Sequence, residues 1–195
     1  SAASDVYKRQ KEDHLRHVLA MLLKDAKTAA RWNNEMQAFA EAQPHGIPVN
    51  ISSDPRNGAS SAGAEYKSGG GQTSAWPEGL GIAATFDPEL VRQVGEAIGA
   101  ETRALGMHEI LAPNLDVARE PRWGRIEETF VEDTYLSSRM AAAIVSGEQK
   151  GDVSRPDAVV AEPKHYCVHG IAEDDADAGI QAALSLIHIS EPTRR

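Results

Sequence analysis

The chain contains 195 residues, with 20 basic and 29 acidic side chains, a formal net charge of −9 at pH 7 and one cysteine. This length is enough for one domain with its own core, a single cysteine excludes an internal disulfide, and no run of about 18 apolar residues predicts a transmembrane helix. The acidic balance argues against a nucleic-acid partner, which would require a basic face, and fits a neutral ligand better than a polyanion.

The two ends of the sequence differ in character from the middle. Residues 1–10 and 184–195 resemble translated sequencing-adapter read-through at the edges of assembled environmental fragments. We therefore expect both ends to be artefacts and the domain to occupy residues 11–183, in which case the start of the chain tells nothing about a signal peptide. The alternative is a genuine terminal strand at residues 184–189, where apolar and polar residues alternate.

The first predicted element is one long helix over residues 12–42. Apolar side chains recur there near the helical period, at Leu15, Leu19, Leu22, Ala26, Ala30, Met36 and Phe39. Pro44 and Gly46 end this helix, and the short apolar run at residues 47–51 predicts a strand. Residues 53–80 are rich in Ser, Gly, Asn and Pro, which predicts a long loop.

The second half of the chain alternates helices and strands. Asp87 and Pro88 form a helix start, with the aspartate as N-cap and proline in the first turn, and Gly106 ends that helix. A strand at residues 109–112 and a loop at residues 113–132 follow. Asp133 or Thr134 opens the next helix, which includes Gly147 and is followed by Gly151, and residues 158–161 form another strand.

This alternation predicts an α/β protein with a parallel sheet. Loops that follow parallel strands meet at one edge of the sheet, and a (β/α) barrel keeps its active site there. Asp54, Arg125 and the Lys164-His165 pair all follow predicted strands. The charged segment PRWGRIEETFVED, at residues 121–133, lies in one of these loops. We therefore expect one pocket that grips a polyhydroxylated or anionic ligand.

Several long motifs carry a family resemblance. They are AARWNNEMQAFAE before GIPVNISSDPRNG, then WPEGLGIAATFDPELVRQVGEAIGAETRALG, then LAPNLDVAREPRWGRIEETFVEDTYL, then KHY. In this order they resemble the N-terminal barrel domain of glycoside hydrolase family 3, the β-glucosidase and β-xylosidase group, over roughly residues 28–175. The resemblance implies a partial (β/α)8 TIM-type barrel of which the chain holds the N-terminal portion only.

The resemblance implies roles for one acidic and one basic side chain, Asp54 and Arg125. Asp54 stands where the family has an aspartate that accepts hydrogen bonds from sugar hydroxyls, and a carboxylate can accept two of them. From the residues alone, a turn aspartate before Pro55 is the favoured interpretation of Asp54. Arg125 stands at the family's substrate-contacting arginine, whose fork of donors suits paired sugar oxygens. The residues alone also allow a salt bridge from Arg125 to Glu128 or Glu132.

Lys164 and His165 match the family's Lys-His pair, which is implied to donate hydrogen bonds to sugar hydroxyls. Adjacent residues on a regular strand point to opposite faces, so both reach one ligand only if the backbone departs from β geometry. The family associates this region with non-proline cis peptides, and we expect irregular backbone at residues 164–167. Without the resemblance, the pair is an ordinary exposed lysine beside a half-buried histidine.

Four other residues have expected roles near this edge. Trp76 and Trp123 have the flat faces that stack on sugars, although core packing is favoured for Trp76. Glu101 lies inside a helix and is expected to tie neighbouring loops together. Asp116 follows the strand at residues 109–112, and we expect it to orient its loop rather than touch substrate.

No metal or cofactor is expected. His165, His169 and Glu173 have the four-residue spacing that binds a metal on a helix, but Gly170 and the preceding strand argue against a helix there. The glycines at 69–71 lack the ending of a phosphate-binding loop.

The resemblance implies a parent protein that hydrolyses terminal non-reducing β-D-glycosides with retention, in the manner of a β-glucosidase. Retaining enzymes need a nucleophile and an acid/base carboxyl about 5 Å apart, and nothing after Lys164-His165 matches either motif. We therefore expect a fragment that binds sugar but is inactive alone. Alternatives are a β-xylosidase of the same family, a non-catalytic carbohydrate-binding module, or a metal-dependent hydrolase using His165 and His169. The family favours a periplasmic or extracellular location.

Overall fold

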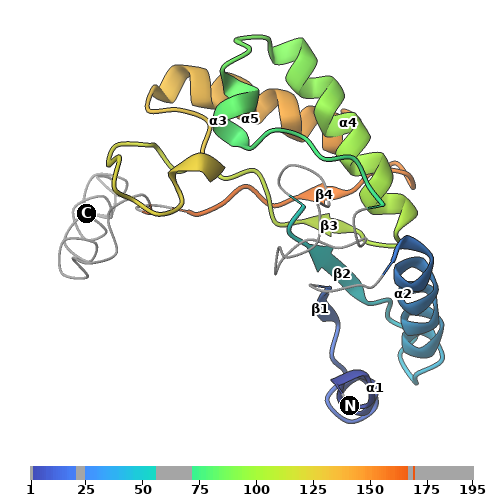
Figure 1. Cartoon of the computed structure of the whole chain (residues 1–195). Coiled ribbons are helices and arrows are strands. Elements are labelled where there is room, and N and C mark those ends of the chain that lie inside the picture. The colour runs from blue at the N-terminus through green and yellow to red at the C-terminus, as the bar shows by residue number, and fades with distance from the viewer. Residues whose placement is uncertain (1, 21–24, 56–71, 167–168, 170–195) are drawn as a thin grey trace, which may run out of the picture.

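The computed structural model of the chain describes residues 2–20, 25–55, 72–166 and 169 (Figure 1). Four strands pair in the order β1-β2-β3-β4, and every pairing is parallel. They are β1 (His17–Leu19), β2 (Asn50–Ser53), β3 (Glu109–Ile110) and β4 (Val160–Ala161). Parallel strands in chain order, joined by helical crossovers, confirm the expected α/β class.

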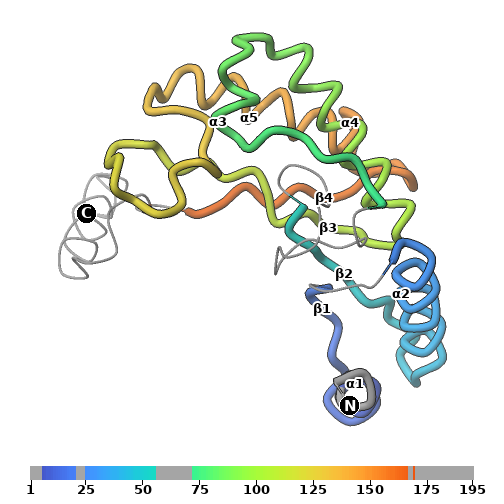
Figure 2. The backbone as a smooth tube through the Cα atoms, in the orientation of Figure 1, coloured from blue at the N-terminus to red at the C-terminus, as the bar shows by residue number. Residues whose placement is uncertain are grey.

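Helices lie between successive strands along the chain. They are α2 (Ala26–Glu41), α3 (Gly79–Ala83), α4 (Pro88–Ala104) and α5 (Thr134–Glu148), with α1 (Ala2–Glu12) before β1 and the 3-10 helix η1 (Ile126–Glu128) in the loop after β3. The backbone tube shows α4 and α5 side by side along one side of the sheet, and α2 beside β2 (Figure 2). In the part of the chain that the structure describes, no helix is long and apolar enough to cross a membrane.

Aspartate caps fix the start of three helices. The side chain of Asp87 accepts hydrogen bonds from the backbone N–H groups of Glu89 and Leu90, with Pro88 in the first turn of α4. Asp133 accepts from the N–H of Leu136 at 2.7 Å and starts α5. Both helix starts agree with the sequence prediction. Asp25 caps α2 in the same way, and this cap was not predicted.

The predicted single helix over residues 12–42 is wrong, because β1 interrupts it. In β1, Val18 lies opposite Ile51 of β2, and the N–H of Ala20 donates to the carbonyl of Ser52 at 2.8 Å. The spacing of Leu15 and Leu19 suits a helix locally, but pairing with a distant strand outweighs that preference. Helix α1 includes most of residues 1–10, and the artefact assignment of both ends stays a prediction, since residues 184–195 lie outside the described part.

The strands are shorter than predicted, and one is displaced. The strand expected at residues 47–51 is Asn50–Ser53, while those expected at 109–112 and 158–161 shrink to Glu109–Ile110 and Val160–Ala161. Helix α3 occupies part of the predicted loop at residues 53–80, of which 56–71 lie outside the described residues.

Two apolar clusters hold the helices against the sheet. The first packs α4 and α5 against β3 and includes Ile98, Ile110, Met140 and Ile144. The second packs α2 against β2 and includes Met36, Ile51 and Met107. Side chains alternate along each strand, so Ile51 and Ile110 are buried, whereas their polar neighbours Asn50 and Glu109 are only partly buried and hydrogen-bond to each other.

Helices α4 and α5 approach closely because glycines line their contact. A Cβ atom added at Gly147 would overlap the backbone carbonyl oxygen of Arg92, and one added at Gly95 would overlap that of Ile144. A Cβ at Gly99 would lie 2.8 Å from the carbonyl oxygen of Glu148. The spacing of the two helices therefore leaves no room for a methyl group.

We expect Gly147→Ala to lower the free energy of unfolding by about 1–3 kcal/mol, because backbone atoms must move apart to admit the methyl group. The matched control is Gly124→Ala, since a Cβ there meets nothing within 4 Å. Urea unfolding followed by circular dichroism measures both variants. Equal stability of the two variants would contradict the tight helix contact.

Glu148, the last residue of α5, is 1% exposed, and neither carboxylate oxygen has a hydrogen-bond partner among the residues that the structure describes. Burial in this apolar contact holds the pKa of the Glu148 carboxyl well above its usual range. The folded state therefore binds this proton more tightly than the unfolded state does. The contribution of this proton to stability is fully present below the pKa of the unfolded chain, and it is lost as pH rises toward the pKa of the folded chain.

We expect Glu148→Gln to remove this pH dependence. In the unsubstituted chain, the unfolding free energy should fall by up to about 1.4 kcal/mol per pH unit as pH rises above about 4.3, the ordinary glutamate pKa. The variant should lack this component and be the more stable of the two at neutral pH. Urea unfolding at several pH values measures the slopes, and parallel slopes for the two chains would refute the assignment.

Candidate functional site

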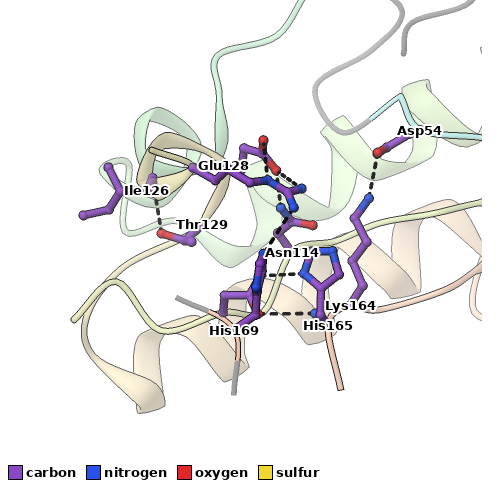
Figure 3. Close-up of polar contacts among 10 residues, drawn as sticks. Asp54, Asn114, Ile126, Glu128, Thr129, Lys164, His165 and His169 are labelled. Atoms are coloured by element: carbon purple, nitrogen blue, oxygen red, sulfur yellow. Dashed lines mark hydrogen bonds and ion pairs between the residues drawn. The ribbon is translucent and has the colours of Figure 1, made fainter. Parts of the chain in front are cut away.

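The polar residues predicted to converge do so at the carboxyl ends of the strands. Asp54 follows β2, Asp116 lies in the segment after β3, and Lys164 and His165 follow β4. Arg125 comes from the loop between β3 and α5, directly before η1. The close-up shows Asp54, Lys164 and His165 gathered in one region (Figure 3). The parallel topology is the reason, because it places the end of every strand at one edge.

An ion pair joins the ends of β2 and β4. The Nζ atom of Lys164 lies 2.7 Å from Oδ2 of Asp54, and the two side chains are 15% and 12% exposed. Figure 3 shows Lys164 extending toward Asp54. Asp54 is therefore more than a turn residue, since its partner lies 110 positions away in the sequence.

The backbone at Lys164 departs from strand geometry, as expected. The peptide bond between Lys164 and His165 is cis, and so is that between Ala112 and Pro113. The Lys164 N–H donates to the Pro113 carbonyl at 2.9 Å, and the Lys164 carbonyl accepts from Leu115 at 2.6 Å. These bonds attach the segment after β4 to the segment after β3.

His165 is held by a buried carboxylate. Nδ1 of His165 lies 2.9 Å from Oδ2 of Asp116, and the His165 backbone N–H points to Oδ1 at 3.4 Å. The Asp116 side chain is 2% exposed, whereas the imidazole is half-buried. The buried carboxylate of Asp116 therefore holds the imidazole of His165, which is one of the predicted site residues.

Arg125 is gripped on one side by Glu128. Its Nε donates to Oε1 at 3.0 Å and its Nη2 to Oε2 at 2.7 Å, which is the paired geometry of a guanidinium and a carboxylate. This is one of the two salt bridges that the sequence left open. The hydrogen bond to Glu128 raises the pKa of Arg125. Asn114, which is buried, donates to the same carboxylate and so links the Arg125–Glu128 pair to the segment after β3.

Other predicted residues take structural positions. Trp123 is 2% exposed, with its ring 5.0 Å from that of His169 in an edge-on contact, so it offers no open face for a sugar to stack on. Trp76 packs against the α4–α5 core, as expected. Glu101 accepts hydrogen bonds from the N–H and hydroxyl of Ser74 at 3.0 and 2.7 Å, which confirms that it ties a neighbouring loop to α4.

His169 is a site residue that the sequence presented only as a metal candidate. Its Nε2 lies 3.2 Å from Nη1 of Arg125, and its ring lies 4.4 Å from that of His165. Nothing in the local spacing signals this arrangement, because it depends on how the loop after β3 meets the chain after β4.

Asp116, His165 and His169 bring possible metal-ligand atoms within 4.8 Å of one another. Glu173, the third ligand considered from the sequence, lies outside the described residues. Two facts oppose a metal at this group: Asp116 already bonds to His165, and the guanidinium of Arg125 lies against His169. A cation there would have a fixed positive charge as its neighbour.

The fold and these contacts define a barrel-type α/β domain with its site at the carboxyl edge of the sheet. The model of the glycosyl hydrolase family 3 N-terminal domain matches residues 7–185. The chain therefore belongs to glycosyl hydrolase family 3, as the sequence motifs predicted.

Curated relatives agree with this assignment. A periplasmic β-glucosidase/β-xylosidase of Dickeya chrysanthemi is 42% identical over 150 residues, which cover 76% of this chain and 23% of that protein. A probable β-glucosidase C of Aspergillus flavus is 36% identical over 169 residues, covering 86% of this chain and 26% of that protein. The chain thus spans about a quarter of the length of the curated relatives it matches.

Solved structures show the same fold. A β-glucosidase from Erythrobacter marinus superposes with a TM-score of 0.72 at 27% identity, covering 86% of this chain and 23% of that one. A family 3 β-N-acetylglucosaminidase from a Paenibacillus species has a TM-score of 0.71 at 23% identity, covering 93% and 36%, and this likeness concerns the fold alone. The fold is the N-terminal portion of a (β/α)8 barrel.

We expect Glu128→Gln to lower the unfolding free energy by about 1–2 kcal/mol, because a neutral amide loses the charge-assisted bonds to Arg125 in a mostly buried setting. Glu120→Gln is the matched control, since Glu120 pairs with Arg122, whose side chain is 83% exposed. Exposed ion pairs contribute little to stability, so the Glu120→Gln variant should unfold like the unsubstituted chain. Equal losses of unfolding free energy in the two variants would show that the Arg125–Glu128 pair stabilises the fold no more than an exposed ion pair does.

Proposed function

We propose that this chain forms the sugar-binding part of a retaining β-glycosidase that removes terminal non-reducing β-D-glucosyl residues. In this proposal Asp54, Arg125, Lys164 and His165 bind the sugar in the −1 subsite. The observation that carries it is the Lys164–Asp54 ion pair across the ends of β2 and β4, beside which Arg125 and His165 both contact His169. The β-glucosidase names of relatives from Dickeya and Aspergillus support the substrate class.

The chemistry of these groups suits a neutral polyhydroxylated ligand. An ionised carboxylate accepts hydrogen bonds, whereas ammonium and guanidinium groups donate them, and each sugar hydroxyl does both. The charges of Asp54 and Lys164 compensate each other at 2.7 Å, and Glu128 compensates Arg125. An anionic ligand would have to displace one of these carboxylates, while a neutral sugar binds without leaving a buried charge unpaired.

We propose that the nucleophile and the acid/base residue come from other parts of the parent protein. Retaining hydrolysis requires one carboxylate that is available to attack and one carboxyl that is available to protonate the leaving group. Within the described residues, three carboxylates at this edge are each bonded to a basic side chain: Asp54 to Lys164, Asp116 to His165 and Glu128 to Arg125. On this proposal the chain alone binds sugar and does not cleave it.

The same evidence leaves a pentose substrate as the second candidate. The Dickeya relative is named for both β-glucosidase and β-xylosidase activity, and a relative from Formosa agariphila is a putative β-xylosidase. A non-catalytic carbohydrate-binding module is the third. We further propose a periplasmic or extracellular location for the parent protein, because relatives from Dickeya and Salmonella are named periplasmic.

Calorimetric titration of the full chain with glucose and with xylose tests the proposal. We expect glucose to bind more tightly than xylose, and Asp54→Asn or Lys164→Met to weaken glucose binding at least about tenfold, or about 1.4 kcal/mol. Asp157→Asn is the control, because Asp157 pairs with Lys150 and Arg155 outside the site. Circular dichroism verifies that each variant is folded.

Two outcomes would overturn parts of this proposal. A folded chain that binds neither sugar, or binds equally well without Asp54 and Lys164, has no sugar subsite at this edge. Turnover of an aryl β-glucoside by the isolated chain contradicts the claim that the catalytic carboxyls lie elsewhere.

A further inference from the structure

We infer that Asp116 is a positioning residue that fixes His165 in its Nδ1–H tautomer, so that Nε2 accepts a hydrogen bond from a sugar hydroxyl. The part that concerns sugar rests on the proposed function, whereas the tautomer itself does not. The inference reverses the role that the family resemblance implies for His165, which is that of a hydrogen-bond donor.

The contact between Asp116 and His165 determines which ring nitrogen carries the proton. Oδ2 of Asp116 lies 2.9 Å from Nδ1 of His165, and an ionised carboxylate can only accept hydrogen bonds. Nδ1 must therefore carry the proton in this pair. A neutral imidazole has one donor and one acceptor nitrogen, so Nε2 is left with its lone pair.

Burial makes this arrangement specific. The Asp116 side chain is 2% exposed, while the His165 side chain is 35% exposed. The carboxylate thus lies behind the ring, and the ring reaches the open side of the site. A second contact orients the carboxylate, because its Oδ1 faces the His165 backbone N–H at 3.4 Å. Both oxygens of Asp116 are therefore directed at the same residue.

The consequence for the site is a balance of donors and acceptors. Lys164 and Arg125 can only donate, and Asp54 can only accept. If His165 also donated, three donating side chains would face a single acceptor, and hydroxyl protons of the ligand would lack partners. With an accepting Nε2 the site offers two donors and two acceptors. That set matches a ligand with several adjacent free hydroxyls, each of which donates one proton and accepts another.

Nitrogen-15 NMR of the full chain labelled at histidine tests the tautomer without any sugar present. A protonated and an unprotonated ring nitrogen resonate at well-separated frequencies, and the spectrum of a His165→Gln variant assigns the signals of His165. We expect the wild-type chain to show a protonated Nδ1 and an unprotonated Nε2. Free imidazole side chains favour the opposite tautomer, so this result requires a specific partner.

Asp116→Asn should reverse the tautomer. If the amide oxygen keeps the contact with the His165 N–H, the amide nitrogen faces Nδ1, which must then accept, and the proton moves to Nε2. Asp116→Ala should shift the ring the same way because the acceptor is gone. Asp157→Asn, the surface control, should leave the spectrum of His165 unchanged.

Glucose titration tests the accepting role of Nε2 separately from the tautomer. Adding glucose to the wild-type chain should move the Nε2 resonance toward lower frequency, as expected when an unprotonated nitrogen accepts a hydrogen bond. A protonated Nε2 in the wild-type chain overturns the inference even if the Asp116 variants do not fold. An unprotonated Nε2 that glucose does not shift, in a chain that binds glucose, overturns the accepting role. Absence of glucose binding overturns the proposed function and leaves the tautomer assignment intact.

Discussion

The backbone hydrogen bonds between β1, β2, β3 and β4 all join parallel strands, so every strand ends at the same edge of the sheet. Side chains far apart in the sequence meet there for that reason alone. Asp54 and Lys164 follow β2 and β4, which do not pair with each other, yet their charged groups lie 2.7 Å apart. Sheet pairing supplies the proximity, and the ion pair then ties together two strands that share no ladder hydrogen bonds.

Carboxylates at this edge hold basic side chains in place. Glu128 grips one side of the Arg125 guanidinium, and Asp116 grips one nitrogen of His165. Both acids are more buried than the groups they hold, which turns the basic groups toward the open side. On the proposed function, a sugar therefore meets side chains whose orientation is already determined, so less conformational freedom is lost on binding. Within the charged segment at residues 121–133, Glu128 supports Arg125 and Asp133 caps α5.

Local features of this fold were predictable and distant ones were not. Asp87 and Asp133 cap helices through contacts within three residues, so the sequence pattern sufficed for both. Strand β1 was missed because three residues carry no reliable pattern, and their structure comes from pairing with β2. The identities of Asp54, Arg125, Lys164 and His165 came from the family motifs. The bond between Asp116 and His165, which are 49 positions apart, needed the fold.

The close glycine contact between α4 and α5 affects the spacing of the segments that carry Arg125 and Lys164. The loop that carries Arg125 starts at β3 and ends at α5, while Lys164 follows β4, the strand after α5. Packing of α5 on α4 thus sets where that loop ends relative to the next strand. A methyl group inserted at Gly147 would change the distance between the end of that loop and β4. On the proposed function, the helix layer outside the sheet therefore contributes to the geometry of the sugar site through Gly147.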